Sequence, residues 1–519
     1  MNTQYYLQSE RAELPSRVEI EPLLLSPMGM ETVVIKSAAV SFVIGLIYFV
    51  LQALNGTDLI ANILFSSAIM AGVSAVVIGG GIRSMIGLLN FSLLLKTLLI
   101  SIALKIFLGQ PSESYLAAPE ITPRVMCLGF IGVLAGTIAA RLIFKRHFPA
   151  CAPVTDPQEL TILFWICFIV GNLAGIVGYF SNFGSVTVEG VSAGGLLGIS
   201  HFLQPLRDFA VAVAVARGYF AGTRRIFMNP LVVLSIAVAT AISFGAGSKI
   251  LLVSPLFYGV LAVFAIQGLR HWPIYLLVTS FCLILGKVVF PIINYSRTED
   301  FARAENAIGA SGDSKWTSSL EVAKRYFSDP NFRASATIAA NESYTENQYF
   351  GNSEFGVWFR FALLGNADNL IAPTAVHGSF TGWQTIVWGI RMLPPRFLYK
   401  NKPMADASLE LAQISGLVDP ETPGAPLAFG FMACMYNAFG LFFGACIGCG
   451  ILSLIFYSCC LWIYGNASNA NIWLIYVVGF WHHLWAEINI STVIATIWQL
   501  AIGWLVLVAT RRVIEILRR

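Results

Sequence analysis

The amino-acid sequence predicts an all-α, polytopic integral membrane protein of about twelve transmembrane helices with a large helical cap loop on the outer face. Three observations lead to this prediction. The 519 residues are 56% hydrophobic and only 12% charged, and the mean hydropathy of +0.72 lies above the range of water-soluble domains. Apolar stretches of about 20 residues, enough to cross a bilayer, recur from residue 34 to the C-terminus. One long polar segment interrupts them late in the chain.

The chain divides into five predicted segments. Residues 1–33 are polar and lack the apolar run and cleavage site of a secretory signal peptide, so the first span should remain as an anchor. Nine spans are predicted in residues 34–294, the outer cap loop in 295–424, three further spans in 425–510 and a short tail in 511–519. The spans lie near 34–54, 59–80, 87–108, 124–144, 160–180, 191–215, 228–247, 250–269, 273–294, 437–463, 471–487 and 491–510.

The basic residues of the short connections predict how the spans are oriented. With a cytoplasmic N-terminus, only Arg124 and Lys249 fall in the short outer loops. Fifteen fall in cytoplasmic segments: Arg11, Arg17, Lys36, Arg83, Arg141, Lys145, Arg146, Arg217, Arg224, Arg225, Arg270, Arg511, Arg512, Arg518 and Arg519. This bias places both termini in the cytoplasm and the cap loop outside. The net charge of +4 is explained by topology and does not indicate a nucleic-acid partner.

The cap loop, residues 295–424, is too long to be a mere connection between two spans. It contains four tryptophans, Trp316, Trp358, Trp383 and Trp388, and two apolar patches at 355–364 and 383–394. Such patches suit short amphipathic helices that lie against the membrane surface. We therefore expect an ordered cap.

Basic residues in the cap are candidates for binding phosphate. Arg360 and Arg391 each lie inside an apolar run, where a charge is costly unless a partner neutralises it. The planar guanidinium fork matches the oxygens of a phosphate or pyrophosphate. The alternatives are pairing with Glu354, Asp368 or Asp406, or extension of the side chain to the membrane interface.

Charged residues within the predicted spans should face the bundle interior or a cavity. They are Lys96, Lys105, Arg207, Asp208 and Lys287. Lys105, Lys249 and Lys287 fall towards outer ends and either add positive charge beneath the cap or extend to the interface. Arg207 and Asp208 are adjacent, so they point in different directions on a helix and should not pair only with each other. Pro205 is expected to kink that span and to open a cavity.

Two short motifs in the cap and the following span carry a resemblance to a known family. Pro394 and Pro395 bend the chain, and Arg396, Lys400 and Lys402 follow before Pro403. The Pro-Arg and Lys-Pro pairs resemble the late outer loop of oligosaccharide repeat-unit polymerases, the Wzy-type O-antigen polymerases. The stretch 424–440 resembles the small-residue entry of that family into the next span, with matching residues at Tyr436, Asn437, Phe439 and Gly440.

A third similarity lies at the outer end of the seventh predicted span, where Gly247, Ser248 and Lys249 stand in place of the family's Gly-Ser-Arg. Two departures accompany the matches. Ala438 interrupts the Asn-Phe pair, and Met435 precedes the tyrosine where an acidic residue is common nearby. A base role at that acidic position is therefore not carried over. The resemblance covers residues 228–463 in detail and the rest of the chain only by topology.

The resemblance implies a polymerase that joins oligosaccharide repeat units carried on undecaprenyl pyrophosphate, at the outer face of the bacterial inner membrane. Arg360, Arg391 and Arg396 would stabilise the pyrophosphate leaving group, and Glu487, at the outer end of the eleventh span, is the chosen general base. The expected substrate contacts are Lys402, Lys249, Tyr436, Asn437, Arg207 and Lys287. Membrane lipids, a chain-length regulator and a flippase are the other expected partners.

Neither a metal ion nor another cofactor is expected. The cap has no Asp-x-Asp pair and no histidine–carboxylate group at ligand spacing. Two other functions stay open at this stage. An O-antigen ligase would use the same donor but transfer the glycan to a lipid A core, whereas a lipid-linked oligosaccharide flippase or transporter would catalyse no bond formation. Against the transporter, the sequence has no paired halves with matching broken helices.

Overall fold

The computed structural model describes part of the chain, and the regular elements in that part are all helices. The all-α prediction is thus confirmed for the described residues. These residues are 27–82, 84–143, 156–182, 203, 205–223, 226–245, 249–267, 280, 288, 291–292, 295, 315–342, 348–350, 362–378, 381–392, 411, 429–464, 503–506, 508–509, 512–513 and 516.

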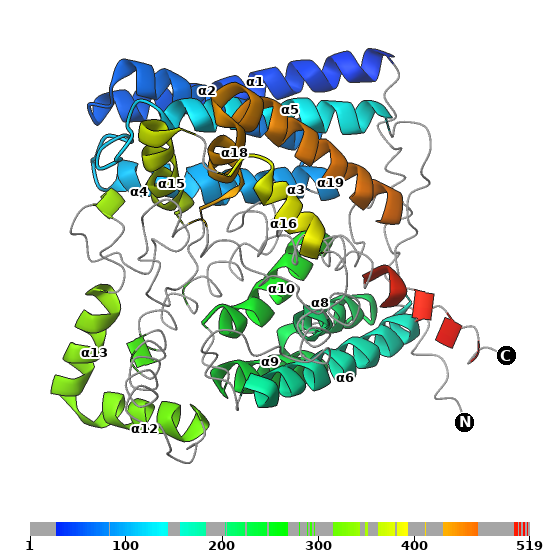
Figure 1. The fold of residues 1–519 in the computed structure, drawn as a ribbon. Coiled ribbons are helices and arrows are strands. Elements are labelled where there is room, and N and C mark those ends of the chain that lie inside the picture. Colours follow the sequence, from blue (N-terminus) through cyan, green and yellow to red (C-terminus); the bar gives the residue numbers. More distant parts are fainter. Residues whose placement is uncertain are drawn as a thin grey trace, which may run out of the picture.

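The helices form two packed groups, and the helices of the cap segment lie beside them (Figure 1). The first group comprises α1 (Pro27–Leu54), α2 (Leu59–Ile78), α3 (Met85–Leu94), η1 (Leu95–Leu99), α4 (Ile100–Phe107), α5 (Thr122–Ile143), α18 (Phe431–Phe439), η5 (Gly440–Gly448) and α19 (Cys449–Tyr464). The second comprises α6 (Pro157–Asn182), α8 (Pro205–Phe220), η2 (Ile226–Met228), α9 (Pro230–Gly245) and α10 (Lys249–Gln267). The cap contains α12 (Lys315–Ser328), α13 (Pro330–Glu342), η4 (Gln348–Phe350), α15 (Leu363–His377) and α16 (Gln384–Met392).

Six helical stretches in the described residues are long and apolar enough to cross a membrane. They are Ser37–Leu54, Leu59–Ile78, Met85–Phe107, Thr122–Ile143, Pro157–Val177 and Phe431–Trp462, and each matches a predicted span. Two shorter apolar helices, Pro230–Ile242 and Ser254–Phe264, fall within two further predicted spans. The molecule is therefore a helical membrane protein. The predicted spans near 273–294, 471–487 and 491–510 lie mostly outside the described residues.

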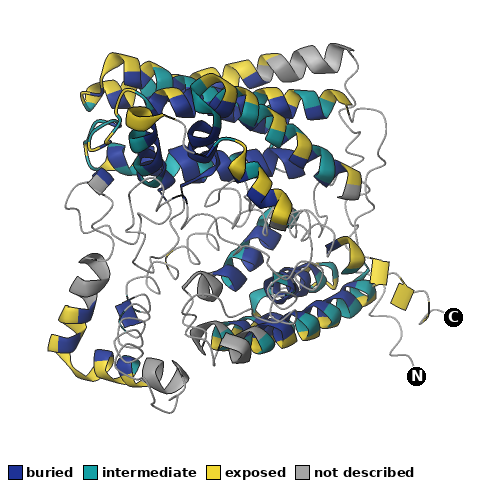
Figure 2. Ribbon diagram, viewed as in Figure 1, coloured by how far each residue is buried: buried dark blue, intermediate teal, exposed yellow. Residues whose placement is uncertain are grey.

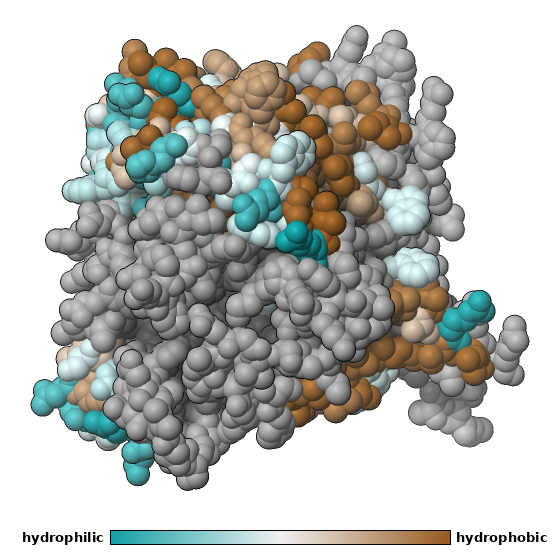
Figure 3. All heavy atoms as spheres, viewed as in Figure 1, coloured by the Kyte–Doolittle hydropathy of each residue, from teal (hydrophilic) through white to brown (hydrophobic). Residues whose placement is uncertain are grey.

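The surface agrees with a membrane environment. Hydrophobic side chains cover α19 and α6, whereas hydrophilic side chains gather where α12 and α13 lie (Figure 3). The first span, Ser37–Leu54, has only 28% of its residues buried, and its exposed side chains include Phe42 and Leu54. Since such a face would be unfavourable in water, it is the face that lipid would cover.

The sixth predicted span, near 191–215, is described only in its second half. Helix α8 occupies Pro205–Phe220, and residue 203 before it is also helical, whereas 191–202 and 204 lie outside the described residues. The kink expected at Pro205 therefore stays a prediction.

A buried asparagine holds four helices of the first group together. The Asn90 carboxamide on α3 donates to the Ala75 carbonyl of α2, at 3.0 Å, and to the Thr137 hydroxyl of α5, at 3.1 Å. Its oxygen accepts a hydrogen bond from the Tyr457 hydroxyl of α19. In a bundle that lacks a hydrophobic driving force between helices, such polar contacts help to fix which helices associate.

Glycines allow α5 to approach η5 and α19 closely. A Cβ at Gly132 would overlap the Cys446 carbonyl oxygen, and one at Gly136 would overlap the Gly450 carbonyl oxygen. The two positions are four residues apart and hence on one face of α5, the spacing of small-residue contacts between membrane helices.

We expect Gly132→Leu to separate these helices and to lower the free energy of unfolding by about 2 kcal/mol or more, because backbone atoms cannot move aside cheaply. Thermal unfolding of the purified protein and its abundance in membranes measure the effect. Gly259→Ala is the control, since a Cβ there meets its nearest neighbours, Phe227 and Val211, at an ordinary 3.5 Å. Equal stability of Gly132→Leu and the parent protein would contradict this packing.

Part of the cap is built into the end of the helix bundle. Helix α15 packs against α18, η1 and α5, and Leu364, Leu370 and Ile371 are fully buried on it (Figure 2). Apart from residues 363–364, this buried helix lies outside the two apolar patches for which surface helices were predicted. The second patch is helical as predicted, at α16 (Gln384–Met392), and most of the first patch lies outside the described residues.

The cap shares one end of the bundle with two predicted outer loops. The Ser112 N–H donates to the Thr57 hydroxyl at 3.1 Å, and the Asp58 N–H donates to Glu113 at 2.8 Å, so the turn after α1 contacts the loop before α5. The Tyr349 hydroxyl from the cap donates to the Ser112 carbonyl at 2.7 Å. These three segments therefore lie at the same end of the spans.

The predicted orientation places that end at the outer face of the membrane. We expect a membrane-impermeant thiol reagent to label Glu120→Cys, an exposed position of the loop before α5, in intact cells. Ala221→Cys, exposed just after α8, should be labelled only after permeabilisation. The reverse pattern would invert the topology. Native cysteines in the described residues are buried or half-buried and should give little background.

Candidate functional site

The described residues include four of the predicted site residues with their side chains. Arg391 lies exposed in the last turn of α16, Tyr436 and Asn437 are buried on α18, and Arg207 is buried on α8. Lys249 is the first residue of α10, and its side chain is not described. The remaining predicted residues, Arg360, Arg396, Lys402, Lys287 and Glu487, lie outside the described residues.

Asn437 joins the start of the last described span to the cap. The Thr381 hydroxyl donates to its carboxamide oxygen at 2.9 Å, and its amide nitrogen donates to the Thr374 hydroxyl at 2.9 Å. Thr374 belongs to α15, and Thr381 lies in the turn before α16. Because Asn437 is fully buried and bonded on both sides, we interpret it as the residue that positions α16, which carries Arg391.

A break in the helix follows directly. Gly440 has φ +77°, a conformation that strongly favours glycine, and the nine-residue π-helix Gly440–Gly448 comes next. Phe439, just before the break, packs edge-on against Trp383 with ring centroids 5.1 Å apart. Short π-helical segments within α-helices are common at functional sites. The break therefore lies next to the junction between the cap and the spans.

Asp368 fixes α15 to the loop before α5. Its carboxylate accepts hydrogen bonds from the Ala117 N–H at 2.5 Å, the Ala118 N–H at 3.2 Å and the Thr122 hydroxyl at 2.6 Å. Burial raises the pKa of this carboxyl, and the three hydrogen bonds oppose that rise. For an acid whose pKa is higher in the folded state, stability falls as the pH rises from the unfolded pKa through the folded one. The group is thus an anchor and is not exposed to substrate.

Lys105 is saturated by protein contacts. Its ammonium group donates to the Gln110 side-chain oxygen at 3.1 Å and to the carbonyl and hydroxyl oxygens of Ser114, both at 2.8 Å. It also lies 4.3 Å from the centre of the Tyr349 ring of the cap. Lys105 thus lies beneath the cap as expected, but its side chain is fully buried and its three donors are used by protein groups, so it serves as a structural contact.

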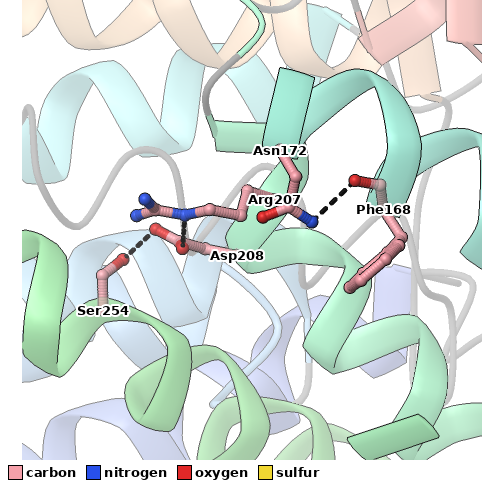
Figure 4. A network of polar contacts seen from close by, with 5 residues as sticks. All are labelled: Phe168, Asn172, Arg207, Asp208 and Ser254. Carbon is pink, nitrogen blue, oxygen red and sulfur yellow. Dashed lines mark hydrogen bonds and ion pairs between the residues drawn. The ribbon is translucent and has the colours of Figure 1, made fainter. Parts of the chain in front are cut away.

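A buried ion pair occupies the second helix group (Figure 4). The Arg207 Nε donates to one oxygen of Asp208 at 2.9 Å, and the Ser254 hydroxyl of α10 donates to the other oxygen at 2.6 Å. The expectation that the two charges do not pair only with each other thus holds for Asp208. It fails for Arg207, whose only hydrogen-bond partner among the described residues is Asp208.

Comparisons with known proteins provide no relative from which the site could be interpreted. No protein-family model, curated protein or solved structure matches this chain. Within the described residues, no group of three or more His, Cys, Asp or Glu side chains lies together in a way that would hold a metal ion.

The sequence did not reveal the anchoring roles of Asp368 and Lys105. The one available signal was a charged residue in or beside an apolar run, and that signal is the same for a ligand-binding residue and for a structural one. The partners of Asp368 are 246 or more residues away in the chain. Only the folded structure brings them together.

Proposed function

We propose that this protein is a membrane glycosyltransferase that polymerises oligosaccharide repeat units carried on undecaprenyl pyrophosphate, at the outer face of a bacterial inner membrane. The observation that carries the proposal is the junction at Asn437. This residue belongs to the motif that resembles Wzy-type polymerases, and it bonds to Thr374 and Thr381 on either side of the turn that leads into α16. The motif residue Asn437 therefore lies beside the turn that leads to Arg391, the one proposed cap arginine among the described residues.

The proposed reaction is a substitution at the anomeric carbon of the donor glycan. A hydroxyl of the incoming repeat unit attacks that carbon, the bond to the pyrophosphate oxygen breaks, and the pyrophosphate lipid leaves with the electron pair. The hydroxyl proton passes to a general base, for which Glu487 is proposed. Arg360, Arg391 and Arg396 stabilise the charge that develops on the leaving group, and Lys402 and Lys249 support them.

The exposure of Arg391 favours this role. Its side chain lies at the end of α16, and no hydrogen bond or ion pair holds it among the described residues. The buried Lys105 differs, because all three of its hydrogen-bond donors are used by protein groups. An exposed guanidinium group that pairs with none of the described residues, at the end that the predicted topology places outside, is available to a phosphate ligand.

The glycan made by cells that lack the protein tests the proposal. A polymerase defect leaves surface glycan with one repeat unit, because transfer to the final acceptor continues without elongation. A ligase defect leaves long chains on the carrier lipid and none on the lipid A core. A transporter defect leaves single units on the cytoplasmic side. Either of the last two results would overturn the proposal.

A further inference from the structure

Tyr115 lies in the loop that joins α4 to α5. It is about midway between Phe107, where α4 ends, and Thr122, where α5 begins. Through Ser112 the same loop is hydrogen-bonded both to the turn after α1 and to the cap. The tyrosine therefore lies beyond the apolar spans, in the loop that contacts the cap, at the end that the predicted topology places outside.

The backbone conformation of Tyr115 is one that favours glycine or asparagine. Its φ is +63°, and among the described residues no other side-chain-bearing residue has a positive φ. The Leu116 N–H donates to the Glu113 carbonyl at 3.1 Å, so Tyr115 is the third residue of a tight turn. Glycine and asparagine suit this position, whereas a large side chain is disfavoured there. A tyrosine in this conformation points to a function of its side chain.

The Tyr115 ring is fixed on one face and accessible on the other. The Lys105 ammonium lies over the ring, 4.9 Å from its centre, and is itself held by hydrogen bonds to Gln110 and Ser114. Tyr115 is nevertheless 59% exposed. Because the buried ammonium covers one face, the opposite face of the ring is open to the solvent.

Polar groups lie near the ring. The Gln110 oxygen accepts from the Lys105 ammonium, which leaves the amide NH2 group of this half-buried side chain for another acceptor. The exposed Asp58 is bonded through its N–H to Glu113, the first residue of the Tyr115 turn. Such a set suits a sugar, whose C–H groups pack on an aromatic face and whose hydroxyls bond to amides and carboxylates.

We propose that Tyr115 binds a sugar ring of the glycan at the outer face, by stacking of pyranose C–H groups on its open face. The inference rests on the proposed function for the class of its ligand. It adds a glycan contact on the loop between α4 and α5, apart from the cap arginines assigned to the leaving group. The contact holds the glycan, and no bond forms or breaks there.

Calorimetric titration of the full-length protein tests the site. The probe is a set of short oligosaccharides, cut by mild acid from the surface polysaccharide of the cells that make the protein and thus free of carrier lipid. The detergent has no sugar head group, because a maltoside would compete. We expect saturable binding, and a parent protein that binds none of these oligosaccharides would overturn the proposal. Polymerisation is measured separately, with lipid-linked units, so the two proposals fail independently.

Variants connect the binding to the ring. Tyr115→Gly should weaken it roughly tenfold. The unfolding temperature should change little, because relief of the positive φ offsets the lost contact with Lys105. Tyr115→Phe keeps the ring and should bind within about twofold of the parent protein. Tyr219→Ala is the control, since Tyr219 is also exposed but lies in the last turn of α8.

A second variant covers the case in which Tyr115→Gly does not fold. Tyr115→Asn then decides, because asparagine also tolerates a positive φ. A tyrosine that only packed on Lys105, or only anchored the loop at the bilayer surface, would leave oligosaccharide binding unchanged in these variants. Binding as tight as that of the parent protein, in either folded variant, would refute the proposal.

Discussion

Replacing Asp368 by leucine is expected to release the cap from the spans and to lower the free energy of unfolding by about 3 kcal/mol or more. The change leaves the Ala117 and Ala118 N–H groups and the Thr122 hydroxyl without their acceptor in a buried place. Asp368→Asn should lower the free energy of unfolding by less, because it keeps one acceptor oxygen and removes a buried charge. Thermal unfolding and protease sensitivity of the cap measure both effects.

Asp329 supplies the matched control for this change. Its carboxylate also accepts two backbone hydrogen bonds, from Asn331 at 2.9 Å and Phe332 at 3.2 Å, but it is exposed at the start of α13. Asp329→Leu should cost only about 1 kcal/mol, since water replaces the lost acceptor. If the two leucine variants lost the same free energy of unfolding, the buried Asp368 would stabilise the fold no more than the exposed Asp329 does.

Replacing Arg391 by alanine should reduce polymerisation by about a hundredfold, the loss that follows removal of a strong charge-stabilising group. Arg391→Lys should also impair it strongly, because lysine keeps the charge but cannot form two parallel hydrogen bonds with pyrophosphate. The same changes at Arg360 and Arg396 are expected to act alike. Gel analysis of glycan length at matched membrane abundance gives the readout.

Arg333→Lys is the control, since Arg333 is an exposed cap residue on α13 and has no proposed role in the reaction. Normal chain length in all three arginine-to-alanine variants, at normal abundance, would rule out the leaving-group assignment. A loss in Arg333→Lys as large as in Arg391→Lys would instead indicate a general need for positive charge in the cap.

The apolar spans were the most predictable part of the fold. Their signal is local, because a bilayer requires about 20 consecutive apolar residues whatever the partners are. Helix α15 was not predicted as a buried element. Its sequence contains Asn366, Asp368, Asn369 and Pro373, a composition typical of a loop. Its burial depends on contacts with α18, η1 and α5, which are distant in the sequence.

The candidate site was less predictable than the fold. The sequence identified Arg207 and Asp208 as costly charges, and it correctly required an interior position for them. The expectation that Arg207 would not pair only with Asp208 was wrong among the described residues. The long arginine side chain folds back to its neighbour, and the spacing of residues on a helix does not predict this. The resemblance singled out Asn437, but its bonds to Thr374 and Thr381 became visible only in the structure.

Incubation of the purified full-length protein with lipid-linked repeat units, in the presence of a chelator, tests the proposed polymerase activity. We expect a ladder of longer glycans on the carrier lipid, undiminished by the chelator, because fixed guanidinium groups neutralise the leaving pyrophosphate. Repeat units recovered unchanged, from folded protein supplied with both donor and acceptor and with magnesium or manganese restored, would contradict the polymerase assignment. A ladder that appears only with added metal would contradict the arginine-centred mechanism.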